Sequence, residues 1–184
     1  MTDTLQAVPA EMRSLARWVV WRLEERNGGK PTKVPYQPAH PHKKAKSTDP
    51  AHWADFDTAV SAANKNGFNG VGFVFDGSGI TGVDLDRCLR NGELREWAKP
   101  IWGALAPVSY CEVTPSGEGL HFITKAKIPA DGWHKLAPVY GLQGTAIEIY
   151  DNGRYFTVTG NADLNHKTIG DGQAAIEWLQ AEHA

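Results

Sequence analysis

Short runs in which apolar and charged residues alternate constrain the fold of this 184-residue chain more than any other feature. The clearest is Val83-Asp-Leu-Asp86, and a period of two predicts a β-strand with one buried face. Asp84 and Asp86 then share the other face, about 6.5 to 7 Å apart along the strand. Two neighbouring carboxylates repel each other unless a cation lies between them, and Mg²⁺ and Mn²⁺ prefer such oxygen ligands. An isolated Asp-x-Asp is more often an ordinary strand with a solvated face.

Two other strands show the same alternation. In Leu120-His-Phe122 and Ile147-Glu-Ile149 the apolar residues face inward, which turns His121 and Glu148 outward. If the three strands share one sheet, three carboxylates and one imidazole gather on one surface. That set predicts a site for one or two divalent metals that hold phosphate oxygens. Taken singly, each of these residues is more often an ordinary surface residue.

A glycine-containing loop precedes His121. Gly117 and Gly119 allow a close approach of the backbone to a ligand, exposed amides cradle phosphate, and Ser116 adds a hydroxyl donor. Most loops of this kind are only hairpin turns. Arg154, at the start of a later strand, suits bidentate contacts with phosphate, and an ion pair with a nearby aspartate is the alternative.

Basic residues concentrate in one segment. Residues 22–46 carry seven basic and two acidic residues, although the whole chain has a net charge of −2. This segment, which includes Lys33, fits either a contact surface for a polyanion or a solvated loop.

The order of the elements predicts an α+β fold with a mostly antiparallel sheet and flanking helices. Strands are expected at 17–23, 32–36, 71–75, within 79–88, and at 109–113, 120–125, 146–150 and 154–159. Helices are expected at 9–16, after the capping residue Asp55, at 93–105 with a kink or split at Pro100, and at 171–182. The first two strands should pair as a hairpin across a turn at 27–30, and the third and fourth as another hairpin. The chain reads as one domain, 1–184, with a basic N-terminal part at 1–66 and a catalytic-sheet part at 67–184.

Several classes of protein do not fit the composition. The chain has no apolar run long enough to cross a membrane, and its start lacks the pattern of a signal peptide. Cys88 and Cys111 alone provide neither a disulfide framework nor a zinc cluster. We therefore expect a cytoplasmic protein.

These pieces together resemble the archaeo-eukaryotic primase superfamily, and more narrowly the primase-polymerase (prim-pol) domains of phage and plasmid replication proteins. The three motifs of that family are matched by Asp84-Leu-Asp86, by Ser116-Gly-Glu-Gly-Leu-His121 and by Ile147-Glu148. The flanking segments 17–21, 29–36, 47–53 and 154–160 are also similar to the phage type. The resemblance covers about residues 15 to 162.

The resemblance implies an RRM-like catalytic core and a template-dependent transfer of nucleotides from dNTPs or NTPs. Asp84, Asp86 and Glu148 would hold two Mg²⁺ or Mn²⁺ ions. The triphosphate would be bound by the residues of the second motif and by two cations: Ser116, Gly117, Gly119, His121, Arg154 and Lys33.

The implied partners are a single-stranded DNA template, a primer and the nucleotide, with residues 22–46 along the template and exposed Trp or Tyr stacked on its bases. A helicase domain or subunit often accompanies such domains, so the chain is either an excised or a standalone catalytic domain. Two alternatives remain open from the residues: a metal-dependent nuclease or phosphohydrolase, and a non-catalytic module that binds single-stranded nucleic acid.

Overall fold

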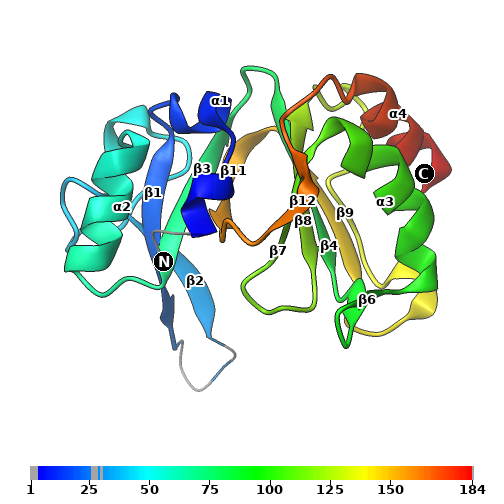
Figure 1. Ribbon diagram of the computed structural model, residues 1–184, viewed down its shortest axis with the longest axis horizontal. Coiled ribbons are helices and arrows are strands. Elements are labelled where there is room, and N and C mark those ends of the chain that lie inside the picture. Colours follow the sequence, from blue (N-terminus) through cyan, green and yellow to red (C-terminus); the bar gives the residue numbers. More distant parts are fainter. Residues whose placement is uncertain (1–3, 26–28, 30, 184) are drawn as a thin grey trace.

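Two antiparallel sheets form the centre of the protein (Figure 1). The structure is a computed structural model and describes residues 4–25, 29 and 31–183. Sheet A has the strand order β11-β3-β1-β2, and its strands are β1 (Trp18–Glu24), β2 (Thr32–Tyr36), β3 (Gly70–Asp76) and β11 (Asn152–Val158). The first hairpin, β1 with β2, is confirmed.

Sheet B contains the strands that carry the acidic residues. Its order is β12-β7-β8-β4-β10-β9. The strands are β4 (Ile80–Asp86), β7 (Tyr110–Val113), β8 (Leu120–Lys125), β9 (Lys135–Leu136), β10 (Ala146–Tyr150) and β12 (Ala162–Lys167). A separate small hairpin pairs β5 (Leu89–Arg90) with β6 (Glu93–Leu94). The predicted α+β class with antiparallel pairing is therefore confirmed, whereas β9, β12 and the small hairpin were not predicted.

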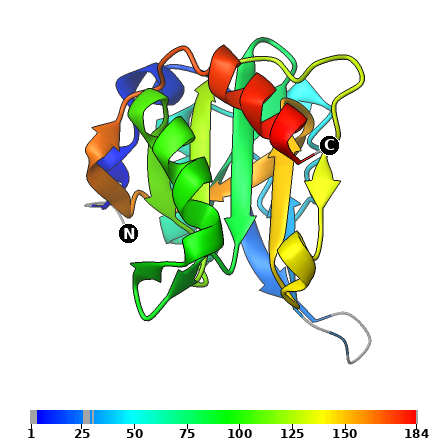
Figure 2. The same ribbon diagram turned by 90° about the vertical axis from the view of Figure 1, so that its right-hand side faces the viewer.

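Helices cover the sheets on their outer sides. Helix α2 (Phe56–Lys65) packs beside β1 and β3, and the short α1 (Ala10–Arg13) lies near them (Figure 1). Helices α3 (Lys99–Leu105) and α4 (Gln173–Glu182) lie across one face of sheet B (Figure 2). Short 3-10 turns occur at Thr4–Ala7, Pro50–His52, Glu96–Ala98, Ala106–Val108 and Val139–Gly141.

The apolar residues of the alternating runs decide which face of sheet B meets α3 and α4. Val83, Leu85, Ile147 and Ile149 have no solvent exposure, and they pack in one cluster with apolar side chains of both helices. Burying each such side chain contributes about 1.5–3 kcal/mol relative to leaving it in water. The acidic residues between them are therefore held on the opposite face.

The expected hairpin of residues 71–86 is wrong. Strand β3 pairs with β1 and β11, whereas β4 pairs with β8 and β10, so the two consecutive strands belong to different sheets. Gly77 and Gly79, with φ of 83° and 100°, turn the chain from one sheet into the other. Both edges of each strand are occupied by partners that come from distant parts of the sequence, which a local pattern does not reveal.

Two predicted helices are shorter than expected. In the segment 93–105, Pro100 lies in the first turn of α3, where the missing backbone N–H costs nothing, and the residues before it form β6 and a 3-10 turn. The segment 9–16 is helical only from Ala10 to Arg13. The turn predicted at 27–30 lies largely outside the described residues.

The expected division at residue 66 does not coincide with a division between the sheets. Sheet A takes β1 and β2 from the N-terminal part but β3 and β11 from the remainder of the chain. Within the described residues, no helix has the length and apolar character needed to span a membrane.

Candidate active site

One row of side chains crosses five strands of sheet B. Asp84 on β4 lies opposite His121 on β8 and opposite Glu148 on β10. The row continues to Glu112 on β7 and to Lys135 on β9. Because directly paired residues point to the same side of a sheet, the predicted gathering of the carboxylates and the imidazole on one face is present in the fold.

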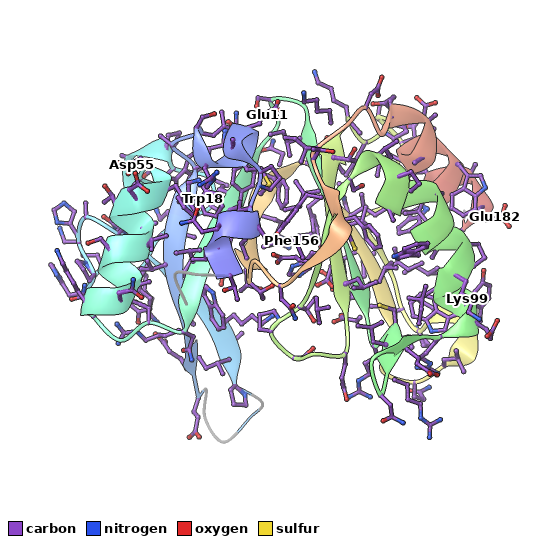
Figure 3. All side chains as sticks on the ribbon, viewed as in Figure 1. Glu11, Trp18, Asp55, Lys99, Phe156 and Glu182 are labelled. Atoms are coloured by element: carbon purple, nitrogen blue, oxygen red, sulfur yellow. The ribbon has the colours of Figure 1, made fainter. Side chains whose placement is uncertain are left out.

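A cavity of about 680 Å³ opens beside this row. Residues of both sheets line it: Pro31, Thr32, Lys33, Asp84, Asp86, His121, Lys135, Glu148, Tyr150, Arg154, Tyr155, Phe156 and Thr157. Phe156 lies between the two sheets (Figure 3). The cavity is rich in both carboxylates and cations, so it suits a ligand that itself combines negative phosphates with positive metal ions.

His121 is on the predicted face but does not reach solvent. Its exposed fraction is 2%, because the ring of Phe156 stacks on its imidazole at 4.8 Å between centroids. Nδ1 lies 3.2 Å from Glu112 Oε1, and Nε2 lies 3.7 Å from Asp84 Oδ2. Burial alone would lower the pKa of His121, but the two carboxylates outweigh it and raise the pKa to about 9. An imidazolium therefore bridges the acidic row at neutral pH.

Glu112 was missed in the sequence analysis, and it is completely buried. Its carboxylate accepts hydrogen bonds from Tyr110 Oη at 2.7 Å and from the backbone N–H groups of Thr159 and Gly160 at 3.1 and 3.0 Å. It thereby ties the chain after β11 to sheet B while it holds His121. If the strands on either side of the loop before His121 are taken to pair as a hairpin, counting residue pairs outward from the loop places Glu112 opposite His121.

The two aspartates that face the cavity are only partly neutralised. Asp84 Oδ1 is buried and has no hydrogen-bond partner. Partial desolvation, followed by the charges of Asp84 and Glu148, raises the pKa of Asp86. These features fit a cation that is bound between the strands. Within the described part of the chain, however, no three carboxylate, imidazole or thiol groups already form a set that could hold a metal ion.

Lys135 engages one of the carboxylates of the row. Its Nζ pairs with Glu148 Oε1, and the pKa of Lys135 is raised, chiefly by this hydrogen bond. Lys135 lies between the strands expected at 120–125 and 146–150, and no local pattern marked it.

The two predicted phosphate-binding cations both reach the cavity. Lys33 comes from β2, and its Nζ lies 5.9 Å from the centroid of the Trp21 ring. Arg154 comes from β11, and its guanidinium lies over the Tyr150 ring at 5.1 Å. Thr157 also lines the cavity, and its buried hydroxyl has no hydrogen-bond partner.

The loop of the second motif is not among the residues that line this cavity. Ser116 Oγ lies 3.0 Å from Thr114 Oγ1 and accepts from the Glu118 N–H at 3.3 Å. Gly117 has a φ of 76°, which suits a tight turn, and the backbone of Leu85 leaves no room for a side chain at Gly119. The loop connects β7 to β8 as a hairpin turn, the alternative that the sequence left open.

Two cations of the basic segment are engaged within the protein. The Arg22 guanidinium lies over the rings of Tyr36 and Phe68, and Lys44 pairs with Glu24 at 3.0 Å. Arg26 and Lys30 lie outside the described residues. Trp18 and Trp21 are buried and the other five tryptophans are partly buried, while Tyr140 has an exposed fraction of 67%.

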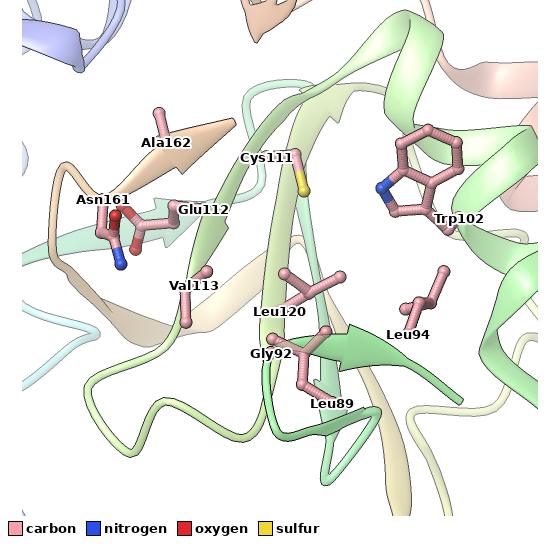
Figure 4. Close-up of a pocket in the computed structure, with 10 residues that line it drawn as sticks. All are labelled: Leu89, Gly92, Leu94, Trp102, Cys111, Glu112, Val113, Leu120, Asn161 and Ala162. Carbon is pink, nitrogen blue, oxygen red and sulfur yellow. The ribbon is translucent and has the colours of Figure 1, made fainter. Parts of the chain in front are cut away.

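A second, more apolar pocket of about 440 Å³ lies beside β7 and β8 (Figure 4). Trp102 of α3 and Leu94 of β6 form one side of it, and Asn161 and Glu112 form the other (Figure 4). It contains none of the three carboxylates that face the larger cavity. The three carboxylates and the two cations predicted from the sequence therefore line the larger cavity and not this pocket.

The chain was compared with known proteins. No family model matches it. Over 171 residues, which are 91% of this chain, it is 37% identical to a protein of Nitratiruptor phage NrS-1 that is named DNA primase-polymerase. The chain spans only 22% of the length of that relative. The identity runs across almost the whole chain, and it supports the presence of a primase-polymerase domain.

Proposed function

We propose that this chain, a homologue of part of a phage DNA primase-polymerase, is a catalytic domain for template-dependent nucleotidyl transfer. One observation carries the proposal: Asp84, Asp86 and Glu148 share one face of sheet B, in a cavity that also contains the phosphate-binding cations Lys33 and Arg154. The name of the relative supports the class of reaction. The carboxylates and cations of the cavity support this chemistry, because phosphoryl transfer requires that the reacting groups are held in position and that their charge is neutralised.

The three carboxylates would hold two Mg²⁺ or Mn²⁺ ions, and the unpartnered Oδ1 of Asp84 and the raised pKa of Asp86 support that assignment. Bound there, the ions would lower the pKa of the attacking hydroxyl and offset the charge of the leaving pyrophosphate. Lys33 and Arg154 would bind the triphosphate of a dNTP or NTP.

His121 would orient Asp84 rather than contact the substrate freely, because Phe156 and Glu112 enclose its ring. Contacts of Ser116, Gly117 and Gly119 with the triphosphate stay a prediction, since these residues do not line the cavity. Single-stranded template DNA and a primer are the expected partners. A helicase domain or subunit stays a prediction, because the relative extends well beyond the matched part.

Incorporation of labelled dNTPs or NTPs on a single-stranded template with Mn²⁺, with and without a primer, tests the proposal. We expect incorporation that is lost in Asp84→Asn and Glu148→Gln but kept in Asp131→Asn, an exposed acid away from the cavity. Release of nucleotides from DNA without any addition would identify a nuclease and contradict the proposal. Salt-sensitive DNA binding without turnover would identify a binding module and would also contradict it.

A further inference from the structure

We propose that Lys135 is a counterion of the acidic site. Its ammonium holds Glu148 in the metal-free protein and is displaced when a divalent metal binds. The inference rests on the proposed role of Asp84, Asp86 and Glu148 as metal ligands. It adds that Lys135, once displaced, contacts the triphosphate of the nucleotide.

The first step concerns contact and register. Lys135 and Glu148 are directly paired residues of β9 and β10, and Lys135 Nζ contacts Glu148 Oε1. The register of the sheet therefore brings the ammonium to the carboxylate at the end of the acidic row. A metal that used the same oxygen would compete with the ammonium for it.

The second step concerns charge. Asp84, Asp86 and Glu148 face one cavity, and the ammonium groups that share it are those of Lys135 and Lys33. One of the three carboxylates, that of Glu148, is engaged by the Lys135 ammonium. Lys135 thus relieves part of the repulsion that a metal would otherwise relieve.

The third step concerns mobility of the side chain. β9 is a two-residue strand at the edge of sheet B, and the side chain of Lys135 has an exposed fraction of 54%, against 23% for Glu148. The ammonium is therefore able to leave Glu148 without unfolding the sheet. Since Lys135 lines the same cavity as Lys33 and Arg154, a triphosphate bound there is within its reach.

The substitution Lys135→Met should change the affinities for Mn²⁺ and for the nucleotide in opposite directions. Without nucleotide, Lys135→Met should bind Mn²⁺ about tenfold more tightly, because the competing charge is gone. With Mn²⁺ and a non-hydrolysable dNTP analogue, the same variant should bind the analogue several-fold more weakly, because a phosphate contact is lost. A variant that was merely damaged would bind both ligands more weakly.

The experiment measures free Mn²⁺ by electron paramagnetic resonance in the full chain, and analogue binding by calorimetry. Lys135→Arg, which keeps the charge, should bind Mn²⁺ like the unchanged protein. Lys99→Met removes a lysine that pairs with Glu96 far from the cavity, so it should change neither affinity.

Two results would overturn the inference in distinguishable ways. If Lys135→Met binds Mn²⁺ no more tightly than the unchanged protein, while Asp84→Asn still abolishes binding, the counterion role is wrong and the metal site stands. If Mn²⁺ binding does not depend on Asp84 in any variant, the metal site itself is wrong, and the counterion role falls with it.

Discussion

The imidazole of His121 and the carboxylate of Glu112 lie 3.2 Å apart in the interior of the protein, where their side chains have exposed fractions of 2% and 0%. Glu112 also accepts the Tyr110 hydroxyl and two backbone N–H groups that follow β11. A buried carboxylate is tolerated only when its charge and its hydrogen bonds are satisfied in this way. The pair therefore orients the site and joins the two sheets.

Glu112→Gln should destabilise the protein by about 3 kcal/mol, because it removes one of the two charged partners of the buried imidazolium and gives a donor to a position that needs only acceptors. Thermal unfolding measures the change. Glu118→Gln, on the exposed loop of the same hairpin, is the matched control and should leave the midpoint unchanged. An unfolding midpoint of Glu112→Gln equal to that of the control would show that the pair does not contribute to stability.

Gly82→Ala should destabilise the protein by about 1–3 kcal/mol, because a Cβ at this position would collide with the rings of Phe75 and Phe156 between the sheets. Gly103→Ala is the comparison. Nothing lies within 4 Å of a Cβ at Gly103, which is inside α3, so that change should stabilise by about 0.5–1 kcal/mol. Chemical denaturation of both variants measures the difference, and equal effects would contradict the close approach of the sheets at Gly82.

Asp55→Ala should destabilise helix α2 by about 1 kcal/mol, since the carboxylate of Asp55 accepts the backbone N–H and the hydroxyl of Thr58 at 2.8 Å. These hydrogen bonds lower the pKa of Asp55 below 3.8, and the bond from the backbone N–H has the largest effect. The charged cap therefore stabilises the protein above pH 3.8, and this contribution is lost as the pH falls through the lower folded pKa.

Unfolding of Asp55→Ala and the unchanged protein at several pH values checks this sign. The difference between their unfolding free energies should be largest near neutral pH and shrink at acid pH. Asp55→Asn, which keeps an acceptor but no charge, should lie between them. A difference that grows on acidification would contradict the assignment of the cap.

Cys88 and Cys111 should not react with thiol reagents in the folded protein. Both are buried, and burial raises the pKa of Cys88 to about 12, so almost no thiolate is present at pH 8. A colorimetric thiol assay should detect no fast-reacting group in the native chain and two after denaturation, the number in the sequence. Rapid labelling of a native thiol would show that one of the two sites opens readily.

The alternating runs were sufficient to predict the faces of β4, β8 and β10, because a side-chain period of two depends only on local backbone geometry. They were insufficient to predict strand partners. The loop of glycines between β3 and β4 is compatible with a hairpin, and only the distant partners β11 and β10 show that the chain changes sheets there.

The sequence by itself determined that Asp84, Asp86, His121 and Glu148 point to the opposite side of their strands from their apolar neighbours, since hydrophobic burial of those neighbours requires it. Only the tertiary structure decided what surrounds them. Register brought Glu112 and Lys135 into the row, and the second sheet placed Phe156 over His121 and Arg154 beside the cavity. These contacts join residues far apart in the chain, so their free energy depends on how the strands assemble and not on any local pattern.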